Sequence, residues 1–123
     1  MSHRPEIIIV DDDPSVRRSL QMLLRGHGYR TRAYRDRASV AHDPEARSAA
    51  LLIADGCLGG GNGFDVLYDL RARGWRGHAV LMTGAATREL AADALAGGFT
   101  AVLDKPPRPN IILNAARAAT AHT

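Results

Sequence analysis

Cysteine, lysine, aromatic residues and long apolar runs are all scarce in this 123-residue chain. The single cysteine, Cys57, excludes an internal disulfide, and the five scattered histidines lack the spacing of zinc ligands. No apolar run exceeds six residues (Ala49–Ala54), which excludes a membrane-spanning segment and the apolar core of a signal peptide. We therefore expect a cytoplasmic protein that makes no membrane contact.

The remaining composition is that of one globular domain. Hydrophobic residues make up 46% and charged residues 24% of the chain, and the length suffices for one core but not for two. We predict a single domain over residues 1–123, with a core over about residues 5–121.

The net charge of +3 raises the question of nucleic-acid binding. Seven arginines lie between Arg17 and Arg37, but no recognition-helix, aromatic or zinc signature accompanies them. We assign them to the outer face of a helix, a charged edge strand and the nearby turns, where they solvate the surface. The prediction is that this domain binds no nucleic acid.

Short apolar runs alternate with helical patterns five times along the chain. Glu6–Val10 is rich in β-branched residues, as in a strand buried on both faces of a parallel sheet. Asp13 can cap the next helix, which would start at Pro14 and end near Gly26. The other predicted strands are 31–34, 50–54, 78–82 and 101–103. The other predicted helices are about 64–74, 88–96 and 110–121, and a region of weak helical pattern, interrupted by Pro44, precedes the third strand. This alternation predicts an α/β fold, with helices on both faces of a parallel sheet.

Polar residues stand where four of these strands end. Asp11 and Asp12 follow the first strand, Asp55 the third, Thr83 the fourth, and Asp104 and Lys105 the fifth. In open parallel α/β sheets, ligands bind at this carboxyl edge. Each residue alone is an ordinary turn or cap residue, but together they predict a binding site.

The residue types at this edge suit phosphoryl chemistry with a metal ion. Adjacent carboxylates offer hard oxygen ligands for Mg²⁺, which takes one or two carboxylates together with waters and phosphate oxygens. A carboxylate can also be the nucleophile that forms an aspartyl phosphate, and Asp55 is the candidate. Thr83 and Lys105 can then bind the remaining phosphoryl oxygens.

Lys105 is the only lysine in a chain with 15 arginines. This choice indicates that the position requires a compact ammonium group rather than a planar guanidinium. Pro106 follows directly and allows a cis Lys105–Pro106 bond, which would aim the ammonium inward.

Taken together, these motifs resemble the receiver domain of response regulators in two-component signalling. The resemblance spans essentially the whole chain and rests on the acidic pair Asp11 and Asp12, the later Asp55, Gly63 eight residues on, Thr83, and the Lys105–Pro106 pair. It implies a flavodoxin-like, doubly wound (βα)5 fold with a five-stranded parallel sheet in strand order 2-1-3-4-5.

The resemblance also implies a mechanism. Asp55 would accept a phosphoryl group from the phosphohistidine of a sensor histidine kinase or a histidine phosphotransfer protein. Mg²⁺ would be held by Asp12, Asp55, the backbone carbonyl of Cys57 and waters, with Asp11 acting through one of those waters. Phosphate and switch contacts would come from Thr83, Gly84 and Lys105.

In this interpretation the domain is no enzyme with a separate substrate, because it catalyses only its own phosphorylation and dephosphorylation at Asp55. A downstream partner would read the phosphorylated state on the face formed by the fourth helix, the fifth strand and the fifth helix. The same reading leaves a homodimer open.

Two positions depart from the family pattern. Gly59 stands where the family commonly has proline, and Val102 stands where it usually has the tyrosine or phenylalanine that moves on activation. Valine has no ring to swing and one stiff side-chain torsion. These departures predict a looser loop after Asp55 and an atypical switch at Val102.

Two alternatives remain open at this stage. The first is a receiver-like binding module that works without phosphorylation, which the changes at Gly59 and Val102 permit. The second is a haloacid-dehalogenase-like phosphatase, because "VDDDPS" contains an Asp-x-Asp after a strand. The phosphatase reading leaves Asp55 without a purpose.

Overall fold

A five-stranded parallel sheet forms the centre of the computed structural model, which describes residues 5–56 and 62–121. The strand order is β2-β1-β3-β4-β5, as the resemblance implied. The strands are β1 (Glu6–Val10), β2 (Arg30–Tyr34), β3 (Leu51–Asp55), β4 (His78–Thr83) and β5 (Ala101–Asp104). The predicted fold class is therefore confirmed.

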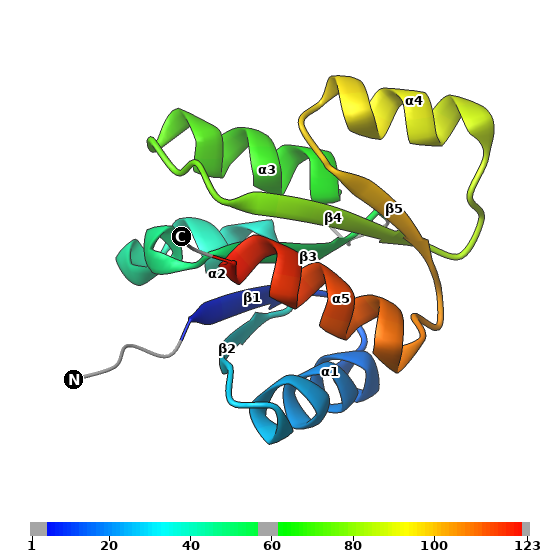
Figure 1. Ribbon diagram of the computed structural model, residues 1–123. Helices are drawn as coiled ribbons and strands as arrows, with labels where there is room; N and C mark the ends of the chain where they lie inside the picture. The colour runs from blue at the N-terminus through cyan, green and yellow to red at the C-terminus, as the bar shows by residue number, and fades with distance from the viewer. Residues whose placement is uncertain (1–4, 57–61, 122–123) are drawn as a thin grey trace.

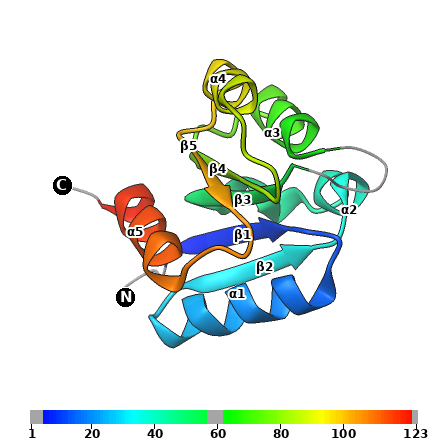
Figure 2. The same ribbon diagram turned by 90° about the vertical axis from the view of Figure 1, so that its right-hand side faces the viewer.

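Helices cover both faces of this sheet. They are α1 (Pro14–Gly26), α2 (Arg37–Ala41), a 3-10 helix η1 (Pro44–Ser48), α3 (Gly63–Ala72), α4 (Arg88–Ala96) and α5 (Pro109–Thr120). Helices α1 and α5 lie on one face, and α2, α3 and α4 lie on the other (Figures 1 and 2). The chain changes face at β1 and β3, which makes the carboxyl end of these two strands the topological switch point.

The central strands supply apolar side chains to both layers. In β1, Ile7 and Ile9 belong to the apolar cluster under α1 and α5, whereas Ile8 and Val10 belong to the cluster under α2, α3 and α4. All four are fully buried. A strand buried on both faces needs a continuous apolar run, which is why β1 shows no alternation of polar and apolar residues.

Three strands extend one residue beyond the predicted ends. Asp55, Thr83 and Asp104 are the last residues of β3, β4 and β5 rather than the first residues after them. The register pairs Asp55 with Met82 and Thr83 with Asp104. Backbone pairing does not depend on the polarity of the side chain, so the sheet continues past the apolar run that marked the strand in the sequence.

Helix α5 also differs slightly, because it begins at Pro109 and ends at Thr120 instead of spanning 110–121. Proline fits the first helical position, since its missing N–H would have no partner there. No helix within the described ranges has the length and apolar character required to cross a bilayer.

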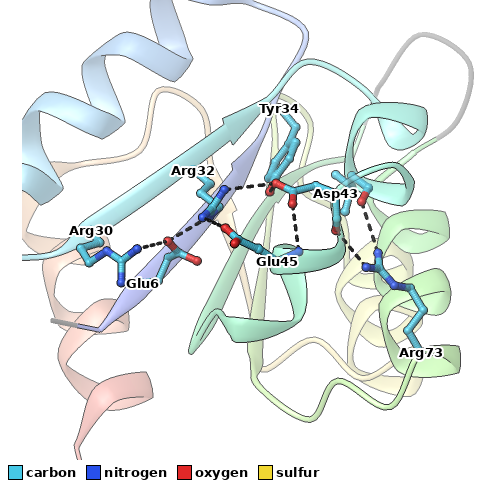
Figure 3. Close-up of polar contacts among 8 residues, drawn as sticks. Glu6, Arg30, Arg32, Tyr34, Asp43, Glu45 and Arg73 are labelled. Carbon is cyan, nitrogen blue, oxygen red and sulfur yellow. Dashed lines mark hydrogen bonds and ion pairs between the residues drawn. The ribbon is translucent and has the colours of Figure 1, made fainter. Parts of the chain in front are cut away.

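A polar network ties the segment between β2 and β3 to the edge strand (Figure 3). The Arg32 guanidinium donates to Glu6 Oε2 at 3.0 Å, to Asp43 Oδ2 at 3.3 Å and to Glu45. The Tyr34 hydroxyl donates to Asp43 Oδ2 at 2.7 Å. Arg32 lies on the edge strand, as predicted, but it does more than solvate the surface, because acids from β1 and from the segment at η1 bind it.

The Tyr34 to Asp43 contact predicts a pH-dependent stability. The Tyr34 hydrogen bond and the N–H of Glu45 hold the pKa of Asp43 below its ordinary value of 3.8. A lowered pKa stabilises the fold above the unfolded-state value and is lost as the pH falls through the folded-state value. We expect Tyr34→Phe to lower the free energy of unfolding by about 1 kcal/mol at pH 7.

That difference between wild type and Tyr34→Phe should shrink as the pH falls below 3.8, where Asp43 takes up a proton in both proteins. Urea unfolding at a series of pH values measures it. A difference that stays constant down to the acid limit would contradict the assignment.

Candidate functional site

Three carboxylates meet at the carboxyl edge of the sheet. Asp11 directly follows β1, Asp12 is the next residue, and Asp55 ends the neighbouring strand β3. One oxygen of each lies within 4.8 Å of the others. Asp11 is fully buried, Asp55 is 4% exposed and Asp12 is exposed, so the cluster opens to solvent on the side of Asp12. Asp11 and Asp55 are 44 residues apart in the sequence, and the parallel pairing of β1 with β3 brings them together.

Lys105 supplies the positive charge of this site. Its Nζ lies 2.9 Å from Asp11 Oδ2 and 3.2 Å from Asp55 Oδ2. The backbone N–H of Lys105 donates to the carbonyl of Thr83 at 2.8 Å, which holds the residue against the end of β4. The peptide bond between Lys105 and Pro106 is cis. The only lysine of the chain thus bridges two of the three acids.

The electrostatics of the site follow from burial and crowding. Burial raises the pKa of Asp11 above its ordinary value, and the charge of Asp55 adds to this, although the bonds from Asp13 and Lys105 act in the opposite direction. Burial lowers the pKa of Lys105, but its hydrogen bonds to Asp11 and Asp55 outweigh this and raise it. Lys105 is therefore a stable cation that offsets the repulsion between two crowded carboxylates.

Arg17 is a neighbour of this site that the sequence analysis did not single out. Its Nη1 donates to the backbone carbonyl of Asp11 at 2.7 Å, while the N–H of Asp13 donates to Asp11 Oδ1 at 2.8 Å. Both contacts fix the backbone that carries the acidic pair. The sequence signal that could have indicated this contact is the Asp13 cap. It starts the helix at Pro14, so that Arg17 lies in the first turn, next to the end of β1.

Thr83, the last residue of β4, lies at the same edge of the sheet. Its Oγ1 accepts a hydrogen bond from the N–H of Ala85 at 3.2 Å, so the hydroxyl stabilises its own loop in this structure. A Cβ added at Gly84 would meet nothing within 4 Å. Gly84 and Ala85 are exposed at the sheet edge, and no packing requirement explains the glycine.

The donor set of the cluster fits a hard divalent cation. Three carboxylates each offer one oxygen within a radius that a single ion can span. Mg²⁺ binds one or two protein carboxylates and fills its remaining positions with waters and phosphate oxygens. The predicted contribution of the Cys57 carbonyl lies outside the described residues, as does Gly59.

Comparison with known proteins decides the family. The profile of the response regulator receiver domain matches residues 7–117. The chain belongs to this family. Receiver domains are parts of two-component response regulators, their standard function is to accept a phosphoryl group, and they are not classical enzymes.

Individual relatives agree with this assignment. The transcriptional regulatory protein FixJ of Azorhizobium caulinodans is 30% identical over 110 residues, which cover 89% of this chain and 52% of that protein. The chain thus spans about half the length of this curated relative. A receiver domain from Methanospirillum hungatei has the same fold, with a TM-score of 0.85 at 23% identity over 94% of this chain and 93% of that one.

Close packing at the site requires glycine at position 63 of this receiver domain. A Cβ at Gly63, the first residue of α3, would lie 2.7 Å from Leu81 Cδ1 and 2.8 Å from the backbone oxygen of Asp55. No side chain fits at such distances. The start of α3 therefore packs directly on the strand end that carries Asp55, with Asn62 and Asp65 forming a capping box there.

Val102, the atypical residue of the family pattern, lies in the middle of the predicted output face. It is half-buried and pairs with Leu81 in the sheet register, and like Leu90 of α4 it packs against the cluster under α2, α3 and α4. Its position on β5 connects the end of β4 with α4. The side chain is a stiff aliphatic contact instead of a mobile ring.

Proposed function

We propose that Asp55 is the phosphoacceptor of this receiver domain and that Mg²⁺, held by Asp11, Asp12 and Asp55, is required for the transfer. The observation that supports this is the bridge from Lys105 Nζ to Asp11 and Asp55 inside a cluster of three carboxylates. A structural ion pair alone needs only one acid for one lysine. The excess negative charge fits a cation and the oxygens of a phosphoryl group.

The proposed chemistry is an in-line transfer. A carboxylate oxygen of Asp55 attacks phosphorus, a P–O bond forms, and the P–N bond to the donor histidine breaks. Bound Mg²⁺ would neutralise the negative charge that develops on the phosphoryl oxygens. Lys105 binds one of these oxygens as a point charge, and the Thr83 hydroxyl, which accepts from the Ala85 N–H, donates its own proton to another. The domain catalyses its own modification and has no separate substrate.

The proposed partners follow from two surfaces. A sensor histidine kinase or a histidine phosphotransfer protein would reach the site on the open side of Asp12. A downstream partner would bind α4, β5 and α5, where Leu95 is 62% and Ile111 is 39% exposed. A cavity of about 660 Å³, lined by residues that include Val102, Pro107 and Ile111, lies on this face. We propose residues 1–123 as one receiver domain that binds no nucleic acid itself.

The test is incubation with acetyl phosphate, with and without Mg²⁺, followed by intact mass spectrometry. We expect a gain of one phosphoryl group only with Mg²⁺, because the acid cluster repels an anionic donor until a cation neutralises it. Absence of modification under both conditions would favour the binding module that works without phosphorylation. Turnover of small phosphoesters would favour the phosphatase.

Lys105→Arg gives a second test of the site. Arginine keeps the charge but replaces a compact ammonium with a bulky planar fork, which cannot lie between Asp11 and Asp55 in the same way. We expect phosphorylation by acetyl phosphate to slow by about tenfold, the cost of one weakened charged hydrogen bond. Arg18→Lys on the exposed surface of α1 is the control. Equal rates for wild type and Lys105→Arg would contradict the role of the ammonium.

A further inference from the structure

A pocket lined by three arginines lies at the edge of the sheet opposite to the acid cluster. Its walls come from 44–49, which lead into β3, and from 73–77, which lead into β4. Because the strands are parallel, segments that precede them gather at the amino edge, away from Asp55. The pocket has a volume of about 480 Å³, and Arg47, Arg73 and Arg76 line it. We call it the arginine pocket.

No carboxylate in the described part of the chain pairs with these arginines. The acids of the neighbouring segments already have partners, because Asp43 and Glu45 bind Arg32, and Asp69 binds Arg37. Burial lowers the pKa of the neighbouring Arg71, and the charge of Arg76 adds to this. The pocket therefore concentrates positive charge that the neighbouring acids do not neutralise.

The hydrogen bonds of the arginines go to backbone carbonyls. Arg47 Nη1 donates to the carbonyl of Arg73 at 3.2 Å. Arg76 Nη1 donates to the carbonyls of Arg71 at 3.2 Å and Trp75 at 3.0 Å. A guanidinium has five N–H donors on three nitrogens. In both residues, Nε and Nη2 have no hydrogen bond to any other described residue, so they remain for a ligand.

These arginines are not needed to close helix α3. The last carbonyls of the helix accept backbone N–H groups, from Trp75 to Leu70 at 3.0 Å and from Gly74 to Arg71 at 3.0 Å. Gly74 has a φ of +89°, the left-handed conformation that ends many helices. Helix termination alone therefore leaves the clustering of the arginines unexplained.

The pocket has a firm base. Trp75 is 3% exposed, and its Nε1 donates to the carbonyl of Ala49 at 2.7 Å. A Cβ at Gly77 would lie 2.2 Å from the Trp75 ring, so only glycine allows the chain to pass it. Arg73 donates to the carbonyls of Val40 and Asp43, at 3.2 and 2.9 Å (Figure 3). Contacts within the protein therefore hold the residues of the pocket in place without a ligand.

We propose that the arginine pocket binds a diphosphate group of a small molecule. Planar guanidinium groups bind phosphate oxygens through paired hydrogen bonds, and Arg47 and Arg76 each keep Nε and Nη2 for such a pair. Arg73, whose Nη1 and Nη2 bind backbone carbonyls, adds its charge. The pocket is larger than a single phosphate requires. Trp75 is buried and offers no face on which a base of single-stranded nucleic acid could stack, which favours a small anion over a nucleic acid.

The test uses inorganic pyrophosphate in buffer with EDTA, where the acid cluster lacks the cation it needs to bind phosphate. We expect the amide NMR signals of residues 44–49 and 73–77 to shift on titration. Arg47→Gln and Arg76→Gln should each weaken binding by about tenfold, the loss of one charged hydrogen-bond pair. Both side chains are exposed, so the fold should survive, whereas Arg73 is avoided because it holds the segment before η1.

Arg18→Gln is the matched control, since it removes the same charge from the exposed surface of α1. It should change the affinity by less than about twofold, because a distant exposed charge is screened. Equal weakening by all three variants, or shifts spread over the whole domain, would show unspecific attraction and overturn the proposal. A short single-stranded oligonucleotide that shifts the same signals at lower concentration than pyrophosphate would also overturn it, in favour of a nucleic acid.

Discussion

Asp55→Asn should abolish phosphorylation completely. The amide oxygen of asparagine is too poor a nucleophile to form an acyl phosphate, and no other carboxylate of the cluster occupies the end of β3. The variant should still fold. Asparagine has nearly the size of aspartate, and the charge that repels Asp11 is removed while Lys105 keeps its bond to Asp11.

Asp104→Asn is the matched control for this experiment. Asp104 is an exposed aspartate at the same edge of the sheet, but it does not belong to the group of three carboxylates. Intact mass after treatment with acetyl phosphate and Mg²⁺ should show one added group in Asp104→Asn and none in Asp55→Asn. Modification of Asp55→Asn to the wild-type extent would refute the assignment of the acceptor.

Gly63→Ala should have the largest effect on stability. The new methyl group would lie 2.8 Å from the backbone oxygen of Asp55 and 2.7 Å from Leu81, and a backbone atom in β3 cannot move aside cheaply. We expect a loss of about 2 kcal/mol in the free energy of unfolding, the usual cost of overpacking a core. Because the strain acts on the strand end that carries Asp55, phosphorylation should also slow.

Gly84→Ala controls for the loss of a glycine in itself. Nothing lies within 4 Å of a Cβ at this position, so its free energy of unfolding should change by less than about 0.5 kcal/mol. Urea unfolding of both variants at one pH measures the difference. Equal stability of Gly63→Ala and Gly84→Ala would show that α3 can shift away from β3 without cost.

Most of the fold was predictable because its local signals agree with one another. The Asp13 cap, Pro14 and the apolar spacing all indicated the helix that the structure places at Pro14–Gly26. The helix at Arg88–Ala96 was likewise predicted to the residue, because it is rich in alanine and two glycines follow it; the structure adds Thr87 as its N-cap. Strand ends were less predictable, since the pairing of Asp55 with Met82 is a property of the sheet and not of the strand.

The members of the site were predictable for a topological reason. Parallel strands place all their carboxyl ends at one edge, so residues after buried runs must converge there whatever their separation in sequence. This argument located Asp11, Asp55 and Lys105 at one edge. It could not show that Lys105 bridges both acids, or that the Thr83 hydroxyl bonds Ala85, because those contacts depend on distances of a few tenths of an ångström.

By itself, the sequence determined which apolar runs form the sheet, in which order strands and helices follow, and which edge of the sheet carries the chemistry. These properties depend on the period of apolar residues and on caps, which are local. Only the tertiary structure decided the partners of the charged groups. Arg32 looked like a solvated surface residue, but Asp43 and Glu45 bind it, and Arg47 and Arg76 line one pocket although they lie on different segments of the chain. Electrostatic partners are set by distances between segments far apart in the chain, and no local pattern encodes them.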